Sequence, residues 1–216
     1  MWGRYDVLDL FIKNNSKYAD ILVIGSEGSK SKEFCEDRGC FYKECPNDPL
    51  DNKLNERIQW FLSRPEYTHI IFLGSDNLIS GEVYDSIVNN SYKYDIISWK
   101  DIFFYDLESK RIFYRNGYTN HRMGEPLAPG RCMSKKFIKN NKQLWDNNIN
   151  RSPDYNIWTK IKDIQSQIVL SCKDIEGIIL DIKTDENINS FDKISKINPK
   201  GNIYTKADVD KINKMI

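Results

Sequence analysis

The chain has 216 residues, of which 40% are hydrophobic and 12% aromatic. This is enough for one sizeable core and too little for two comfortable domains, so we expect a single domain over residues 1–216. Lys and Arg number 32 against 31 Asp and Glu, a net charge of +1. Such a balance excludes a field that would by itself recruit nucleic acid or an anionic membrane, and nucleic acid is not an expected partner.

The cysteines indicate a reducing compartment. They are odd in number and cannot all pair with one another: Cys35, Cys40, Cys45, Cys132 and Cys172. The first three lack a CxxC pattern and both histidines lie far from them, so unpaired structural thiols are expected and not a metal site. No signal peptide and no apolar run of membrane-spanning length is visible. We therefore expect no transmembrane segment and a cytoplasmic location. If the protein is viral, the cytoplasm is that of the host cell.

Helices and strands alternate in the first third of the sequence. Apolar residues at helical spacing predict helices over 5–15, with Asn14–Asn15 as a stop, and over 51–64. Continuous apolar runs over 21–24 and 70–73 predict strands that are buried on both faces. A short helix ending at Gly39 and a short strand over 40–45 are predicted between them. The alternation predicts an α/β sheet, in which ligands bind beyond the carboxyl ends of the strands.

The second half predicts further strands and helices that make the sheet a mixed one. Helices are expected over 81–90 and 152–163, and at the C-terminus over 206–216. Residues 94–118 predict a strand and then a hairpin that turns near Glu108–Ser109. Residues 130–141 begin with a strand and continue as a helix, and 177–183 form another strand.

Two turns follow the buried strands and are the first candidates for a site. Gly25-Ser26-Glu27 and Gly74-Ser75-Asp76 both stand at carboxyl ends of strands, so they should line the same crevice. Asp76, followed by Asn77, could hold a hard divalent cation against phosphate oxygens. The alternative is a turn in which the Asp76 carboxylate caps the next helix.

Three further segments carry polar groups, each with an ordinary structural explanation. Asn52 and Lys53 stand at the mouth of a helix that favours an anion, or they belong to a solvated surface helix. Residues 121–134 contain two prolines and two glycines and predict a rigid loop presenting Glu125 and Arg131, or only a connector. Asp154 lies in the first turn of a helix, where a carboxylate is common for structural reasons.

The chain resembles a glycosyltransferase of the GT-A fold, on seven segments in this order: "GSEGSK", "NDPLDNKLNE", "FLGSDN", "YDIISWKDIFFYDL", "GEPLAPGRCMS", "SPDYNIWTKI" and "GIILDIKTDENINSF". It looks most like the small, family-two-like enzymes of bacteria, phages and large DNA viruses, including chlorella viruses. The resemblance covers nearly the whole chain. It implies a mixed, mostly parallel central sheet flanked by helices.

The resemblance also implies an activity. A hexosyl or deoxyhexosyl unit would pass from a nucleotide sugar, such as a UDP-sugar, to a hydroxyl of a glycan or protein-linked glycan, with inversion and with Mn2+ or Mg2+. Asp76 matches the metal-binding Asp-x-Asp-like motif, in which Asn77 replaces the second acid. Asp154 matches the catalytic base and Glu125 would lie on the acceptor side. The residues expected at the donor are Arg4, Gly25, Ser26, Glu27, Asn52, Lys53, Ser75, Asp76 and Arg131.

Two features of the sequence leave other readings open. Asn77 contributes no charge to a metal, and the strand that precedes the first helix in this family is missing, so the sheet has lost a strand or the chain starts downstream of the natural one. A catalytically inactive module that binds a nucleotide sugar or a glycan is therefore the alternative. A nucleotidyltransferase is a third possibility, although "GSEGSKSK" matches its glycine-rich loop only loosely.

Overall fold

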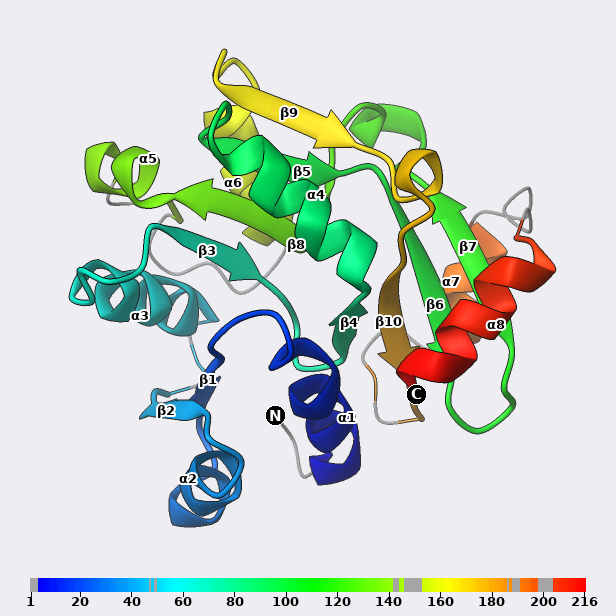
Figure 1. The fold of residues 1–216 in the computed structure, drawn as a ribbon, viewed down its shortest axis with the longest axis horizontal. Helices are drawn as coiled ribbons and strands as arrows, with labels where there is room; N and C mark the ends of the chain where they lie inside the picture. The colour runs from blue at the N-terminus through cyan, green and yellow to red at the C-terminus, as the bar shows by residue number, and fades with distance from the viewer. Residues whose placement is uncertain are drawn as a thin grey trace.

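The computed structural model describes residues 4–46, 48, 50–141, 144–145, 153–185, 187, 191–197 and 204–216 (Figure 1). The helices in these ranges are α1 (Tyr5–Asn15), α2 (Ser29–Glu36), α3 (Leu50–Leu62), α4 (Gly81–Ser91), α5 (Lys135–Asn140), α6 (Pro153–Ile161), α7 (Phe191–Ile197), α8 (Lys206–Met215) and the 3-10 turns η1 (Asn120–Arg122) and η2 (Lys173–Ile175). The strands are β1 (Leu22–Gly25), β2 (Phe41–Glu44), β3 (His69–Phe72), β4 (Asn77–Ile79), β5 (Ile96–Trp99), β6 (Asp101–Asp106), β7 (Ile112–Asn116), β8 (Leu127–Ser134), β9 (Gln167–Leu170) and β10 (Ile179–Lys183). Among these helices, none is long and apolar enough to cross a bilayer.

The strands form three sheets, with the orders β1-β2, β4-β10-β6-β7 and β3-β8-β5-β9. The mixed α/β class is as predicted, but the expectation of a mostly parallel sheet is wrong. Parallel pairing joins β1 to β2, β6 to β10 and β5 to β9, while the other four pairings are antiparallel. The reason is β8, which runs antiparallel between β3 and β5 and so separates two strands that the alternating pattern would have made parallel neighbours.

Most of the predicted elements are present, and the structure adds further ones. The helices predicted from periodicity appear as α1, α3, α4, α6 and α8, and the predicted hairpin is β6–β7. Three elements were not predicted, namely β4, β9 and α7. The segment expected as a rigid loop before a strand already belongs to β8 from Leu127 onward. The five cysteines are all buried and unpaired, as predicted.

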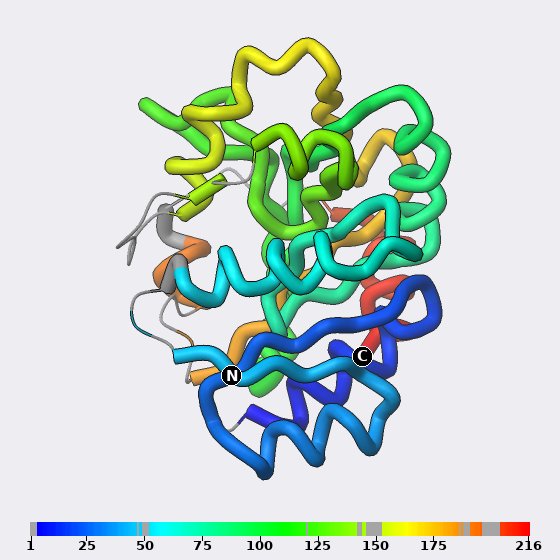
Figure 2. The backbone as a smooth tube through the Cα atoms, turned by 90° about the vertical axis from the view of Figure 1, so that its left-hand side faces the viewer, coloured from blue at the N-terminus to red at the C-terminus, as the bar shows by residue number. Residues whose placement is uncertain are grey.

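Helix α1 joins the small β1–β2 sheet to the larger sheet beside it. Its apolar face, with Leu8 and Ile12, packs in one core with Val23 of β1 and with Leu180 of β10. Helix α2 packs against both β1 and β2, and α3, which crosses the middle of the molecule in cyan in Figure 2, packs against β1. The small sheet is therefore covered by α2 and α3, and Lys53 near the start of α3 reaches Ser26 just beyond the carboxyl end of β1.

The asparagines that were predicted as a helix stop have a second role. Asn14 and Asn15 are both buried, and their side chains bond the backbone of β4. Asn14 Nδ2 donates to the carbonyl of Ile79 at 2.8 Å, and Asn15 bonds both the Asn77 carbonyl at 3.0 Å and the Ile79 amide at 3.1 Å. Because β4 is the outermost strand of its sheet, these bonds satisfy backbone groups that no strand pairs.

A buried carboxylate ties β6 to the segment after β9. Asp101 has no exposed surface. Its oxygens accept from the Tyr114 hydroxyl at 2.8 Å, the Ser171 hydroxyl at 3.0 Å and the Cys172 amide at 2.7 Å. A buried charge that is fully hydrogen-bonded in this way fixes the relative position of the chain segments that it joins.

Candidate functional site

A cavity of about 750 Å3 opens where the carboxyl ends of β3 and β10 meet the start of α6. Its walls come from α3, β3, β4, β6, β8, β10 and α7 and from the chain between β7 and β8. The charged side chains that line it are Arg57, Arg115, Arg122, Arg131, Asp154, Asp181 and Lys183. Five of these are cationic and two are acidic, so the cavity favours an anionic ligand. A second hollow, of about 710 Å3, lies around His69 and Lys135 and contains none of the predicted site residues.

An irregularity in β8 brings Arg131 into the cavity wall. The register of β8 against β5 shifts between the pairs Ile97–Cys132 and Trp99–Leu127, so β8 bulges over 128–131. Gly130 takes a φ of 79°, which a residue with a side chain adopts only under strain. The Trp99 indole donates to the Gly130 carbonyl at 3.0 Å and holds the bulge in place. Bulges of this kind re-aim side chains next to active sites.

Asp154 stands at the other side of the cavity, in the first turn of α6 as predicted. Burial raises the pKa of this carboxyl above its ordinary value, and the nearby guanidinium groups of Arg131 and Arg122 counteract the rise. A partly buried carboxylate whose desolvation is offset by neighbouring cations is typical of a general base. The structure thus brings three of the predicted residues, Asp154, Arg131 and Asn77, to the same cavity.

Glu125 is buried and paired with Arg122. Arg122 Nε donates to one carboxylate oxygen at 2.7 Å, while Arg122 Nη2 donates to the other. This pairing raises the pKa of Arg122 above its ordinary value. Arg122 also lies over the Tyr118 ring, with its guanidinium carbon 3.7 Å from the ring centroid. Glu125 does not itself line the cavity, and in this arrangement it orients the arginine that does.

Asp76 lies beside the end of the cavity that is formed by β4 and β10, between the lining residues Gly74 and Asn77, and does not itself line it. Its carboxylate accepts from Asn187 Nδ2 at 3.1 Å and lies 3.5 Å from Arg4 Nη1. Burial, together with the charge of Asp76, raises the pKa of Asp181 to about 7, and Lys183 Nζ lies 2.7 Å from Asp181 Oδ1. The predicted residues Arg4 and Asp76 are therefore in contact, next to an acid–lysine pair that was not predicted.

The turn after β3 has small residues for a steric reason. A side-chain carbon on Gly74 would lie 2.7 Å from Asp76 Oδ1 and 2.9 Å from Asn77 Oδ1, so only glycine leaves these two oxygens room. Asn77 Oδ1 accepts from the Gly74 amide at 2.7 Å, and Asn77 begins β4. The alternative in which Asp76 caps the next helix is wrong, because β4 intervenes and Ser80 is the residue at the start of α4.

The residues predicted beside the nucleotide form a separate group at the end of β1. Lys53 is buried and donates to Ser26 Oγ at 3.1 Å. Burial lowers the pKa of Lys53, and the Glu27 carboxylate opposes this shift. Gly25 leaves room for the Tyr42 ring, whose hydroxyl would come within 2.5 Å of an added side-chain carbon. These residues do not contribute to the lining of the cavity, so the two turns do not share one crevice there.

The remaining predicted residues are at the edges of these groups. Asn52 is exposed on the first turn of α3, next to Lys53. Ser75 is half-buried in the turn between β3 and β4 and does not line the cavity. Neither side chain has a position in the structure that by itself indicates a ligand.

Several lining residues were missed by sequence reasoning, although two of them leave a signal. Asp181 and Lys183 alternate with apolar residues in β10 and so point to the same side of the strand. Arg57 lies on the same helical face as Leu54, Ile58 and Phe61, where a charge interrupts an apolar stripe. Arg115 lies in the hairpin strand β7, in which the sequence shows no pattern that singles it out.

The oxygen donors at the Asp76 end have the chemistry that Mn2+ and Mg2+ prefer. Asp76 and Asp181 are two carboxylates close enough for the charge of one to raise the pKa of the other. Asn77 fits less well, because its amide oxygen already accepts the Gly74 amide. Within the described residues there is no group of three or more His, Cys, Asp or Glu side chains that could hold a metal ion. A cation here would rest on two carboxylates and on oxygens of its ligand.

Comparison with known proteins shows the fold. No protein-family model matches the sequence, and no curated protein matches it. A 4-diphosphocytidyl-2C-methyl-D-erythritol synthase from Anaerococcus prevotii is similar in structure, with a TM-score of 0.52 and 13% identity over 76% of each chain. The bifunctional IspDF of Campylobacter jejuni is similar with a TM-score of 0.51 and 14% identity, covering 76% of this chain. The similarity to A197 from STIV has a TM-score of 0.44, with 12% identity over 78% of this chain and 98% of that one.

The first two similarities show a mixed α/β fold shared with these enzymes. The chain spans about two fifths, 41%, of the bifunctional enzyme. At these identities the likeness concerns the fold, and function has to be argued from the site.

Proposed function

We propose that this protein is a glycosyltransferase of GT-A type, which transfers a sugar from a nucleoside diphosphate sugar to an acceptor hydroxyl. The observation that carries the proposal is Asp154, a carboxylate of raised pKa in a cavity lined by four arginines and a lysine. A base and a concentration of cations are the two things that this reaction requires, because a proton must leave the acceptor while negative charge grows on the leaving diphosphate.

In the proposed reaction the acceptor oxygen attacks the anomeric carbon as the bond from that carbon to the diphosphate breaks. Asp154 takes the proton of the attacking hydroxyl, and the configuration inverts. Positive charge develops at the anomeric carbon, as in other glycosyl chemistry. Lys183 and Arg4, which flank Asp181 and Asp76, offset the charge of the departing diphosphate. Mn2+ or Mg2+ held by Asp76 and Asp181 would supply further positive charge to the phosphate oxygens.

The group at the end of β1 fits the nucleoside part of the donor. Lys53 and Ser26 form a hydrogen-bonded pair beside Glu27, at the start of α3. The partners in this proposal are a nucleotide sugar and a glycan or protein-linked glycan, and the absence of a strong net charge speaks against nucleic acid.

Nucleotidyl transfer is the second candidate, favoured by the similarity to 4-diphosphocytidyl-2C-methyl-D-erythritol synthase. In that reaction a nucleoside triphosphate would react with a sugar phosphate and release diphosphate. The two candidates differ in the bond that is made, so the products separate them. Glycosyl transfer releases a nucleoside diphosphate, whereas nucleotidyl transfer leaves the nucleotide attached to the acceptor.

The test is isothermal titration of the protein with a panel of nucleoside diphosphates, nucleoside triphosphates and nucleotide sugars, with and without Mn2+. We expect binding of one nucleoside diphosphate and its sugar that requires Mn2+ and is lost in Asp76→Ala. Asp154→Ala should keep this binding and lose transfer. Transfer at the parent rate in Asp154→Ala would contradict the base, and preferential binding of a triphosphate would favour nucleotidyl transfer. Donor binding with no turnover in the parent would indicate a binding module.

A further inference from the structure

Two arginines in the cavity have buried N–H groups without hydrogen-bond partners. Arg131 is 3% exposed, and its Nε and Nη2 have no partner. Arg57 is half-buried as a residue, but its Nε is buried and has no partner. Both residues line the cavity. Because a buried N–H group without an acceptor costs free energy, these three donors indicate an acceptor that is supplied by a ligand.

The same two arginines are held in place by their surroundings. The Arg57 guanidinium carbon lies 4.6 Å from the centroid of Phe72 and 5.0 Å from that of Trp145. Phe72 of β3 is in turn the residue that pairs with Arg131 of β8 across the sheet. Contact with two rings restricts the Arg57 guanidinium, and its charge is close enough to that of Arg131 for the two to affect each other.

The local charges do not balance. Burial, together with the positive charge of Arg131, lowers the pKa of Arg57 to about 10, although the Asp154 carboxylate opposes this shift. Asp154 is the acid that attracts both, and Glu125 is already paired with Arg122. Three guanidinium groups thus face two carboxylates, which leaves one positive charge uncompensated at the Asp154 end of the cavity. A like-charged, desolvated arginine pair favours an anion of matching geometry.

We propose that Arg57 and Arg131 bind an anionic group, a carboxylate or a phosphate monoester, on the acceptor. This inference rests on the proposed function, because the arginines are near Asp154, which is the proposed base for the acceptor hydroxyl. The resemblance implied that Arg131 binds the donor. In the proposed function, however, the diphosphate of the donor lies beside Asp76, Asp181 and Arg4, whereas Arg131 is near Asp154. The anion would accept hydrogen bonds from Arg57 Nε, Arg131 Nε and Arg131 Nη2.

The proposal is tested by comparing three sugars that share the glucose ring and differ at carbon 6: glucose, glucuronate and glucose 6-phosphate. Each is titrated into the full chain by calorimetry, and the fluorescence of Trp145, isolated by comparison with Trp145→Phe, reports on the arginine that it stacks against. We expect at least one charged sugar to bind about 10-fold more tightly than glucose. Which of the two does so distinguishes a carboxylate from a phosphate. The preference should disappear in Arg57→Met.

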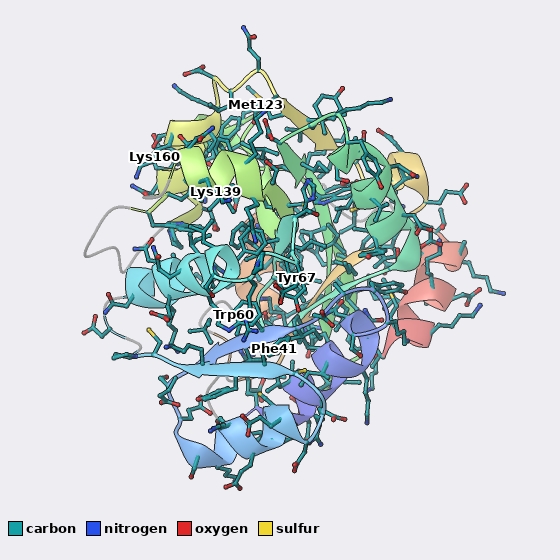
Figure 3. All side chains as sticks on the ribbon, turned by 60° about the vertical axis from the view of Figure 1, so that its left-hand side comes forward. Phe41, Trp60, Tyr67, Met123, Lys139 and Lys160 are labelled. Carbon is teal, nitrogen blue, oxygen red and sulfur yellow. The ribbon has the colours of Figure 1, made fainter. Side chains whose placement is uncertain are left out.

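Arg64, which lies just after α3, provides a matched control for Arg57. Arg64 also stacks on two rings, with its guanidinium carbon 5.5 Å from Phe41 and 5.0 Å from Trp60. Figure 3 shows Phe41 and Trp60 beside Tyr67, where α3 meets β2, and none of them lines the cavity. Arg64→Met should therefore keep the full preference for the charged sugar. Arg57→Lys, which retains the charge, should keep part of it and serves if Arg57→Met unfolds.

The outcomes separate this inference from the proposed function. If Asp76→Ala loses the nucleoside diphosphate but keeps the charged sugar, and Arg57→Met does the reverse, two anion sites exist. Equal binding of all three sugars by the parent would overturn the arginine site and leave the donor site untouched. Loss of nucleoside diphosphate binding in Arg57→Met would also overturn it, because the arginines would then belong to the donor.

Discussion

At the scale of single residues, the molecule is defined by charges that are kept away from water. Asp154 and Arg131 are desolvated against each other, and the net effect of burial is to raise the pKa of the carboxyl and lower that of the guanidinium. Functional sites tolerate such costs because the same groups are most reactive or most attractive to ligand when they are poorly hydrated. The charged form of Asp154 should therefore lower the free energy of unfolding of the protein.

This gives a prediction for the pH dependence of stability. The folded pKa of Asp154 lies above its ordinary value of 3.8, so the folded state retains this proton at pH values at which the unfolded state has lost it. Stability therefore falls as pH rises from the unfolded to the folded pKa, and is level above the latter. We expect the unfolding free energy of the parent, minus that of Asp154→Asn, to decrease as pH rises through and above 3.8.

The measurement is urea unfolding of both proteins at a series of pH values, in which the titrating groups that do not interact with Asp154 cancel. A difference that increases with pH would mean that the attraction of the arginines lowers the pKa of Asp154 more than burial raises it.

The resemblance led to Asp154 and Arg131, and both line the cavity. It could not lead to Arg57, because a charge within an apolar helical stripe is recognised as functional only when the opposite wall is known.

At the scale of elements, the bulge in β8 is the feature that builds the cavity wall. A flat β8 would continue its register with β5 past Cys132, whereas the observed strand inserts residues between Leu127 and Arg131. Gly130 makes this possible with its positive φ and its contact with Trp99 and Ile179. The Pro-Gly composition of the segment indicated a rigid backbone, but not that it would be part of a strand.

We predict that Gly130→Ala destabilises the protein by about 2–4 kcal/mol, since the added carbon is strained by φ and lies 2.9 Å from Ile179 and 3.0 Å from Trp99. Gly124→Ala is the matched control, because Gly124 has a φ of 88° with nothing within 4 Å, and should cost only about 1 kcal/mol. Thermal and urea unfolding of the two variants measure both. Equal losses would mean that the contact with Trp99 and Ile179 is easily relieved.

The success of sequence reasoning also differs between elements. Helices with an apolar stripe, such as α1 and α4, were predicted within a residue or two, because their periodicity is local information. β9 was missed because Gln167–Leu170 is short and exposed in part, so it shows neither a buried run nor a clear alternation. β4 was missed because three residues after a turn carry no period at all.

At the scale of the whole molecule, sheets of different robustness are combined. Every residue of β5 is buried, and the strand is paired on both sides by β8 and β9. The β1–β2 sheet has only two strands, and three of the four residues of β2 are exposed. Strand partners depend on contacts between distant segments, which is why the pairing of β8 with β3, and with it the antiparallel character of the sheet, could not be predicted locally.

We predict that the β1–β2 pair opens locally, well before the molecule unfolds. Two-stranded sheets are marginal by themselves, and local openings start where few apolar contacts hold the chain. In native-state hydrogen exchange, amides of Val23 and Tyr42 should exchange at a lower free energy than those of Ile97 and Cys132. The latter should approach the free energy of global unfolding. Uniform protection over both sheets would show that the molecule opens as one unit.

The asparagine pair at the end of α1 has a consequence beyond the fold. Outer strands expose unpaired amides and carbonyls that can template a strand of another molecule, and many proteins blunt them with charge or proline. Here the amide side chains of Asn14 and Asn15 already occupy those groups of β4. Helix α1 therefore prevents a strand of another molecule from pairing with the free edge of β4. This protection depends on two neutral side chains in one helical turn.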